Sequence, residues 1–226
     1  MSFWEYLASC HHQLLMDAFR HAGVVFQCTA CAAVLGVLIA VVACRSDRAG
    51  RLAAATTGGF RTVPALAVIG LLVPVVGLGA APTVAALTLC GLLPVVRSSI
   101  VGLRTVGMPR ADMANTARGG LPHPVRLVRV ELPEAWPSIL TGMRTSTRLL
   151  MGVAAIAACA SGPGLGNEIF RGLGAPGSKN ALNEVLAGTL GIVVLSLLFD
   201  AAYLLLGRLT LSGRPSVPAQ PEERPT

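Results

Sequence analysis

The residues best suited to polar chemistry lie between Arg97 and Arg148, where eight arginines interrupt long apolar stretches. No Ser/His/Asp grouping and no nucleotide-binding lysine motif accompanies them. Guanidinium groups in such numbers suit charge-assisted contacts with a partner surface. The sequence therefore predicts a docking region in this segment rather than an enzyme active site, and we expect no catalytic residue.

Two short helices separated by a break are expected within this arginine-rich segment. Residues 111–118 lack Gly and Pro and suit a helix, which Gly119-Gly120 would end. A second helix is expected over residues 125–132, and Pro133 and Pro137 would mark the return toward the membrane. Apolar residues on both helices favour a compact helix-turn-helix knob that seats in a partner's groove.

The composition of the chain predicts an all-α integral membrane protein. Of its 226 residues 53% are hydrophobic and 13% are charged, whereas soluble domains are about 25% charged. One crossing needs about 20 apolar residues. On this basis five transmembrane helices are expected, at residues 24–44, 62–78, 80–97, 147–162 and 185–207.

The basic residues predict how these helices are oriented. Fifteen of the 18 Lys and Arg residues fall in segments 45–61, 97–148 and 208–226, and three fall on the other side. Cytoplasmic loops carry such an excess of positive charge. We therefore expect an external N-terminus and a cytoplasmic C-terminus, in a multi-pass protein of the plasma membrane. Because the arginines flank apolar runs, the net charge of +7 indicates no nucleic-acid partner.

The two ends of the chain are expected to lie outside the membrane-spanning domain, residues 23–207. Residues 1–22 contain Asp17, Arg20 and a His pair, whose burial in lipid is costly, so they predict an amphipathic segment on the outer face. Residues 208–226 are rich in Pro and predict a disordered cytoplasmic tail.

The six cysteines predict neither a metal site nor a redox site. Five of them lie in or at the ends of apolar runs, where Cys behaves as a small hydrophobic residue. Cys28 and Cys31 have the spacing of a redox motif, but no strand is expected near them. We expect no metal and no cofactor.

The chain resembles the permease subunits of type I ABC importers, through two neighbouring motifs. Ala117-Arg118-Gly119-Gly120, followed by Val130-Glu131-Leu132-Pro133, is similar to the cytoplasmic coupling loop of that family, expected here over residues 104–140. The resemblance extends over roughly residues 10–210. Four further motifs are similar to those of one branch of this family, which imports glycine betaine, carnitine, choline or proline. They lie at residues 62–67, 91–94, 140–145 and 161–166.

The resemblance implies a set of partners and a set of coupling residues. The loop would dock on a cytoplasmic ATPase subunit, a second permease subunit (identical or related) would complete the pathway, and an external binding protein would deliver the solute. Two residues depart from the family pattern, since Asn115 replaces its glutamate and Thr116 an alanine. The implied coupling residues are Asn115, Thr116, Ala117, Arg118, Gly119, Gly120, Val130, Leu132 and Pro133.

Two further groups of residues leave alternatives open. Asp200 lies in the last expected span. It is either a functional group or a hydrogen-bonding partner near Tyr203 and Arg208. Prolines and glycines in or beside the spans either permit packing and turns or line a pathway and its gate. These pathway or gate candidates are Pro64, Pro74, Pro94, Gly162, Gly164 and Gly166.

The leading hypothesis is a permease subunit of an ATP-driven importer for a quaternary amine or a related compatible solute, located among the lipids of the cell membrane. The alternative is a membrane scaffold or sensor that has kept the permease fold and lost transport coupling, which the replacement of the family glutamate by Asn115 motivates.

Overall fold

A computed structural model describes residues 2–44, 79–117, 123–160 and 162–211, with the single positions Ala67, Gly70, Leu71 and Pro74. The described segments are helical, with turns between the helices. In chain order the elements are α1 (Phe3–Ala43), α4 (Ala80–Ala117), α5 (His123–Arg126), a π-helical turn (Leu127–Glu131), α6 (Leu132–Ala157), a 3-10 turn (Ala158–Ala160), α7 (Gly166–Gly174) and α8 (Ala181–Leu211).

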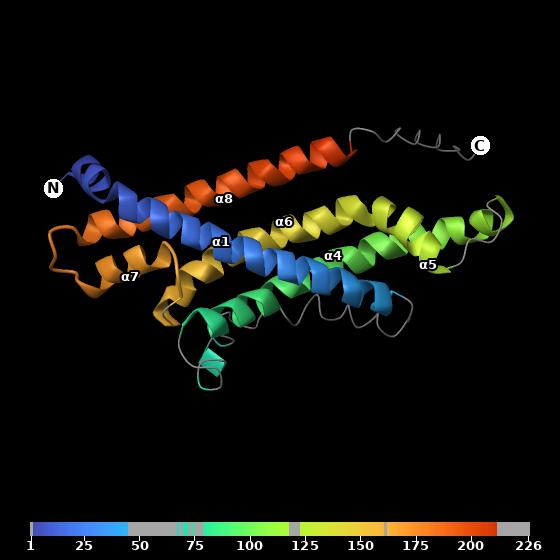
Figure 1. Cartoon of the computed structure of the whole chain (residues 1–226), viewed down its shortest axis with the longest axis horizontal. Coiled ribbons are helices and arrows are strands. Elements are labelled where there is room, and N and C mark those ends of the chain that lie inside the picture. The colour runs from blue at the N-terminus through green and yellow to red at the C-terminus, as the bar shows by residue number, and fades with distance from the viewer. Residues whose placement is uncertain are drawn as a thin grey trace, which may run out of the picture.

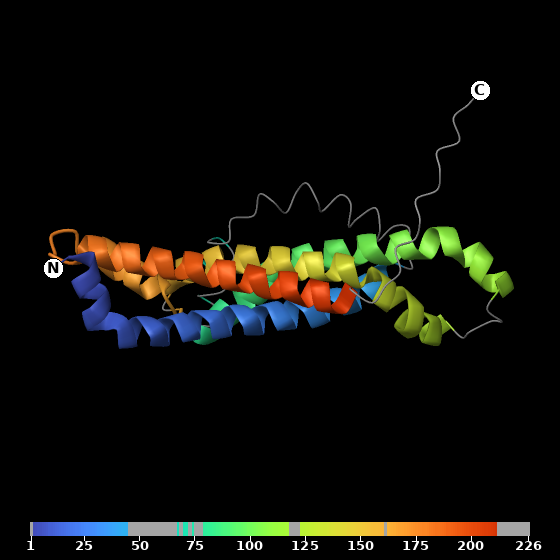
Figure 2. The same cartoon turned by 90° about the horizontal axis from the view of Figure 1, so that it is seen from above.

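Helices α1, α4, α6 and α8 run side by side along the long axis of the molecule (Figures 1 and 2). The last turns of α4 and helix α5 lie at one end, and α7 lies at the other end beside the N-terminus. Each buried core joins three helices. One core includes Val25, Leu87 and Leu150, and the other includes Ala40 and Ile139.

Helix α1 begins with a capping box. The Ser2 hydroxyl accepts the Glu5 N–H at 3.3 Å, and the Glu5 carboxylate accepts the Ser2 N–H at 2.9 Å. From this start α1 continues for 41 residues, so the boundary expected at residue 22 is not a helix boundary. Asp17 and His21 are buried against the bundle. Figure 2 shows the first turns of α1 bent away from the rest of the helix.

Glycines allow α4 and α6 to approach each other closely. A Cβ atom added at Gly142 of α6 would lie 2.8 Å from the Cβ of Ser98 on α4. A Cβ added at Gly91 of α4 would lie 2.7 Å from the hydroxyl oxygen of Ser146, which donates to the Gly91 carbonyl at 2.9 Å. Helices in lipid associate through such small residues because lipid removes the hydrophobic driving force between them.

The expected spans agree only in part with the observed helices. Three described helices are long and apolar enough to cross a membrane, namely Phe3–Ala43, Thr83–Val106 and Ala181–Leu211, and they contain the spans expected at 24–44, most of 80–97, and 185–207. The span expected at 62–78 falls, apart from single positions, outside the described residues. The span expected at 147–162 corresponds to the second half of α6, which is followed by a 3-10 turn.

The arginine-rich segment folds differently from the expected pair of short helices. Residues 111–117 are the last turns of α4, and α5 joins α6 through the π-helical turn. Pro133 lies in the first turn of α6 and Pro137 lies inside this helix, so neither proline ends a helix. Helix α8 likewise continues through Leu211, into the expected tail, and residues 212–226 lie outside the described part.

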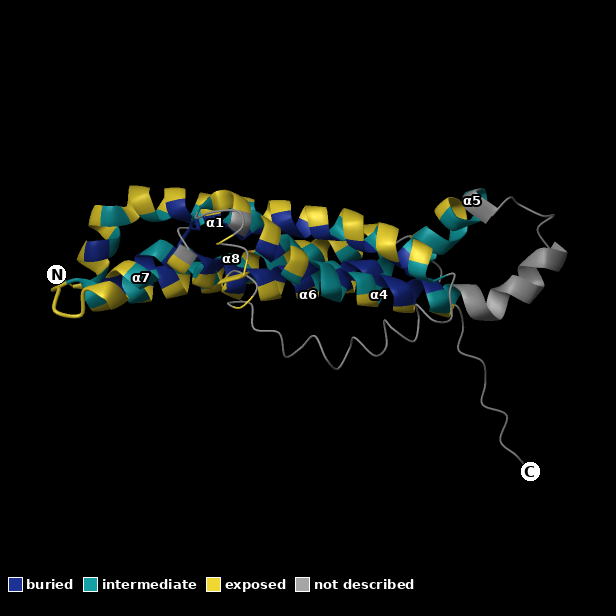
Figure 3. Cartoon of the chain, turned by 90° about the horizontal axis from the view of Figure 1, so that it is seen from below, coloured by how far each residue is buried: buried dark blue, intermediate teal, exposed yellow. Residues whose placement is uncertain are grey.

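The outer surface of the bundle is mostly apolar. Figure 3 shows the exposed residues on the outward faces and the buried ones between the helices. The exposed side chains on α1 and α8 include many large hydrophobic ones, of Phe, Leu, Val, Met, Ile and Trp, the types that lipid accepts.

Candidate functional site

Those of the expected coupling residues that the structure describes lie at one end of the bundle. Asn115, Thr116 and Ala117 form the last residues of α4, but their side chains are not described. Arg118, Gly119 and Gly120 lie outside the described residues. Across the gap, Val130 is half-buried in the π-helical turn, Leu132 is half-buried at the start of α6, and Pro133 is exposed.

An ion pair closes the π-helical turn. The Nε of Arg126 donates to a carboxylate oxygen of Glu131 at 2.9 Å, and Glu131 is mostly buried. The turn widens because Pro133 has no N–H to donate and its ring would collide with the carbonyl four residues earlier. The N–H of Leu132 therefore bonds to the carbonyl of Leu127, five residues back.

One side-chain bond ties this end of α6 to α8. The indole N–H of Trp136 donates to the hydroxyl oxygen of Thr210 at 3.1 Å. Trp136 also packs in the core that contains Ile100 and Ala135. A displacement of the loop end would thus be transmitted to α4 and α8 together.

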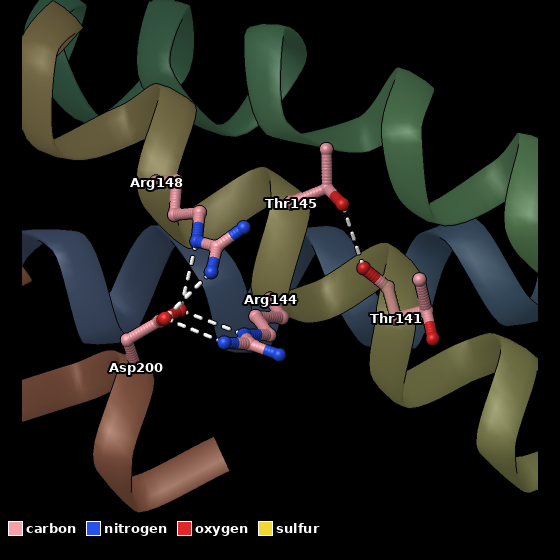
Figure 4. A network of polar contacts seen from close by, with 5 residues as sticks. All are labelled: Thr141, Arg144, Thr145, Arg148 and Asp200. Carbon is pink, nitrogen blue, oxygen red and sulfur yellow. Dashed lines mark hydrogen bonds and ion pairs between the residues drawn. The ribbon is translucent and has the colours of Figure 1, made fainter. Parts of the chain in front are cut away.

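Further along α6, two arginines clamp one carboxylate of α8 (Figure 4). Arg144 donates from Nε and one terminal nitrogen to the two oxygens of Asp200, at 2.7 and 2.5 Å. Arg148, one turn later, repeats this bidentate pattern at 2.8 and 2.5 Å. The sequence places Tyr203 and Arg208 near Asp200, whereas the ion-pair partners of Asp200 are on α6.

A line of hydroxyls crosses the bundle beside this cluster. Thr147 of α6 lies 3.2 Å from the hydroxyl of Thr29 on α1 and 3.0 Å from that of Tyr203 on α8. Its hydroxyl also donates to the carbonyl of Met143 at 3.0 Å. These contacts hold three helices in one register at the level of the arginine–aspartate cluster.

The opposite end contains the three glycines proposed as gate residues, all of them buried. Gly164 has a φ of +120°, and a Cβ there would meet His21 of α1 at 2.8 Å. The backbone at Gly162 and at Gly166 packs closely against the end of α6. Among the prolines, Pro94 is half-buried, Pro74 is exposed, and Pro64 lies outside the described residues. Only the glycines come together.

A buried carboxylate organises the same end. Glu168 of α7 is 1% exposed and accepts from the Tyr6 hydroxyl at 3.1 Å and from the Gln13 amide at 2.9 Å. Arg171 lies 3.1 Å from it. Sequence reasoning did not find this hub, because Glu168 lies more than 150 residues from its α1 partners.

The arginine–aspartate cluster was also missed, although its signal was present. Arg144 and Arg148 are four residues apart and so share one helix face, and Asp200 is the only charged residue between Val185 and Gly207. Within the described part of the chain, no group of three His, Cys, Asp or Glu side chains could hold a metal ion. Asp200 and Glu168 instead join helices to one another.

Comparison with known families decides what kind of bundle this is. The family described as "Binding-protein-dependent transport system inner membrane component" matches residues 32–211. The chain belongs to this family. It is therefore a multi-pass membrane component of a transport system rather than an enzyme, and the resemblance to ABC importer permeases is confirmed.

Other members of this transport family match most of the chain. The choline transport system permease protein OpuBB of Bacillus subtilis is 30% identical over 201 residues, covering 87% of this chain and 88% of that protein. The carnitine transport permease protein OpuCB of Listeria monocytogenes is 28% identical over 203 residues, covering 88% and 87%.

The fold also matches a solved transporter. A chain of the MetNI methionine ABC transporter, in an inward-facing conformation, superposes with a TM-score of 0.72 and 17% identity, covering 87% of this chain and 95% of that one. The described helices thus have the arrangement of an ABC importer permease.

Proposed function

We propose that this chain is the membrane-spanning permease subunit of an ATP-binding-cassette importer for a compatible solute, a quaternary amine such as glycine betaine, choline or carnitine. The observation that carries the proposal is the family match over residues 32–211, together with relatives named for choline and carnitine transport that are covered almost end to end.

The proposed topology has five crossings, an external N-terminus and a cytoplasmic C-terminus. The distribution of basic residues supports it, and so does the position of Arg126 and Arg129 at the α5 end, far from Arg171 and Lys179 beside α7. On this topology the α4–α5 end faces the cytoplasm and the Glu168 hub faces outward.

The proposed partners follow from the two ends. A cytoplasmic ATPase subunit would bind residues 104–140, an external substrate-binding protein would dock near α7, and a second permease subunit would complete the pathway. Force on the loop would reach α4 and α6 as one unit because glycines pack them so closely. The Trp136–Thr210 bond would carry the same force to α8. Alternating access would then be a rigid-body rocking of this unit.

Reconstitution tests the proposal directly. In proteoliposomes that contain the chain, its ATPase, the second permease subunit and the binding protein, labelled glycine betaine or choline should enter only with ATP and the binding protein. Omitting ATP or omitting the binding protein is the control. Uptake driven by this chain alone would contradict the proposed function.

The alternative of an uncoupled scaffold rests on Asn115, which replaces the family's glutamate with a neutral amide. Charge-assisted hydrogen bonds are about twice as strong as neutral ones. If the native protein is a working importer, Asn115→Glu should change the transport rate less than about tenfold. A larger gain, absent in the matched variant Thr116→Ala, would favour the scaffold or sensor.

A further inference from the structure

The outward face of α6 differs from those of α1 and α8. From Thr141 onward its exposed residues form one stripe at helical spacing: Thr141, Thr145, Arg148, Leu149, Gly152 and Ile156. The half nearer the loop end is polar, whereas the exposed residues of α1 between Cys31 and Val42 and of α8 between Leu190 and Leu206 are all apolar. Since lipid-facing helix surfaces are apolar, the polar half of this stripe faces something other than lipid.

Arg148 makes this point most strongly. Its side chain is 53% exposed, yet it is bound to Asp200, which lies seven residues, or about 10 Å, inside the expected end of the last span. A charge at such depth is costly in hydrocarbon and faces protein or water. Bidentate bonding to Asp200 also keeps the guanidinium from extending along α6 to the membrane surface.

The cluster has unused capacity for an anion. Two guanidinium groups and one carboxylate leave one net positive charge. An arginine has five N–H donors, and each of these two directs Nε and one terminal nitrogen at Asp200. Figure 4 shows the second terminal nitrogen of both Arg144 and Arg148 pointing away from Asp200.

We infer that Arg148, with Arg144 and Asp200, forms a carboxylate-binding subsite on a water-filled path along α6, and that it selects zwitterionic solutes over cationic ones. This inference rests on the proposed function and specifies its substrate class. Glycine betaine and carnitine carry a carboxylate that neutralises the cluster and accepts the remaining N–H donors. Choline has a positive charge and no carboxylate, so the cluster repels it.

Asp200 has a positioning role in this subsite. It fixes both guanidinium planes through paired hydrogen bonds, so less side-chain entropy is lost when the solute binds. It also lowers the charge of the subsite from two to one, which limits how tightly the carboxylate is held and allows its release into the cell.

Competition between two labelled solutes tests the subsite in the reconstituted importer. Arg148→Gln should lower the ratio of glycine betaine to choline uptake by about tenfold or more, the loss of one charge-assisted contact. Arg148→Lys keeps the charge but loses the bidentate bond to Asp200, so it should lower the ratio less than Arg148→Gln does. Arg20→Gln, which removes a positive charge at the other end of the bundle, is the matched control. An unchanged ratio in Arg148→Gln overturns the inference.

Thiol labelling tests the path independently of transport. In a cysteine-free background, Thr145→Cys on the polar stripe should react with a charged methanethiosulfonate reagent in the assembled transporter, and glycine betaine should slow the reaction. Leu197→Cys, on the apolar face of α8, should not react. If Thr145→Cys is equally inert, the stripe faces lipid or protein and the inference is wrong. If it reacts but wild-type importer moves neither solute, the proposed function fails while the water-filled path stands.

Discussion

At the scale of single residues, Asp200 joins α8 to α6 through four charged hydrogen bonds. Asp200→Asn should lower the melting temperature of the purified protein by several degrees, because two arginines would face each other without a carboxylate. Asp200→Asn combined with Arg148→Gln should recover part of the loss, since one unpaired charge is gone. Thermal unfolding in detergent measures both. A double variant less stable than the single one would show that the pairing with Arg148 is unimportant.

Glu168 has the same role at the opposite end, where it is fully enclosed. Glu168→Ala removes the acceptor of three donors from α1 and α7. It leaves the buried Tyr6 hydroxyl without its partner and should cost about 1–3 kcal/mol. Arg171→Gln changes only a half-exposed partner and should cost less than about 1 kcal/mol. Chemical denaturation of the purified protein compares the two. Equal effects would contradict the role of Glu168 as the hub.

At the scale of elements, the α4–α6 contact depends on the absence of side chains. Gly142→Ala places a methyl group 2.8 Å from Ser98 and 3.1 Å from the Pro94 carbonyl, and should destabilise the bundle by about 1–3 kcal/mol through overpacking. Gly152→Ala on the same helix meets nothing within 4 Å. It should be neutral or stabilising, because Ala favours helix by about 1 kcal/mol over Gly.

The melting temperatures of these two alanine variants test the close approach of the helices. Gly142→Ala should melt below the wild type and Gly152→Ala at or above it. If both variants melt alike, α4 and α6 lie farther apart than the structure places them.

How far the sequence predicts these elements depends on the range of the forces involved. The apolar runs of α1, α4 and α8 are local, and the sequence predicts membrane spans there. The partners of Asp200 and Glu168 were missed because pairing between distant segments has no local signature.

The loop end shows a second reason for error. Pro133 and Pro137 were expected to mark the return of the chain toward the membrane, after a helix over residues 125–132. The structure keeps the helix through both, with Pro133 in the first turn of α6 and a π-helical turn before it. Packing of Ala135 and Ile139 in the core outweighs the free energy lost with the helical hydrogen bonds at the two prolines. A local sequence pattern does not show this packing.

At the scale of the whole molecule, the proposed function requires the two ends of the bundle to face different compartments. The α5 end must face the side that holds ATP, because the motor binds there. The loop between α7 and α8, which contains the exposed Lys179, must face the external binding protein. Single cysteines at His123 and Lys179 in a cysteine-free background can therefore report the orientation.

An impermeant thiol reagent added to intact cells should label Lys179→Cys, and should label His123→Cys only after the membrane is permeabilised. The two positions control for each other, since each must react under one condition and so proves that its thiol is accessible. The reverse pattern would place the arginine-rich end outside, where no ATPase could bind it, and would overturn the importer mechanism together with its coupling loop.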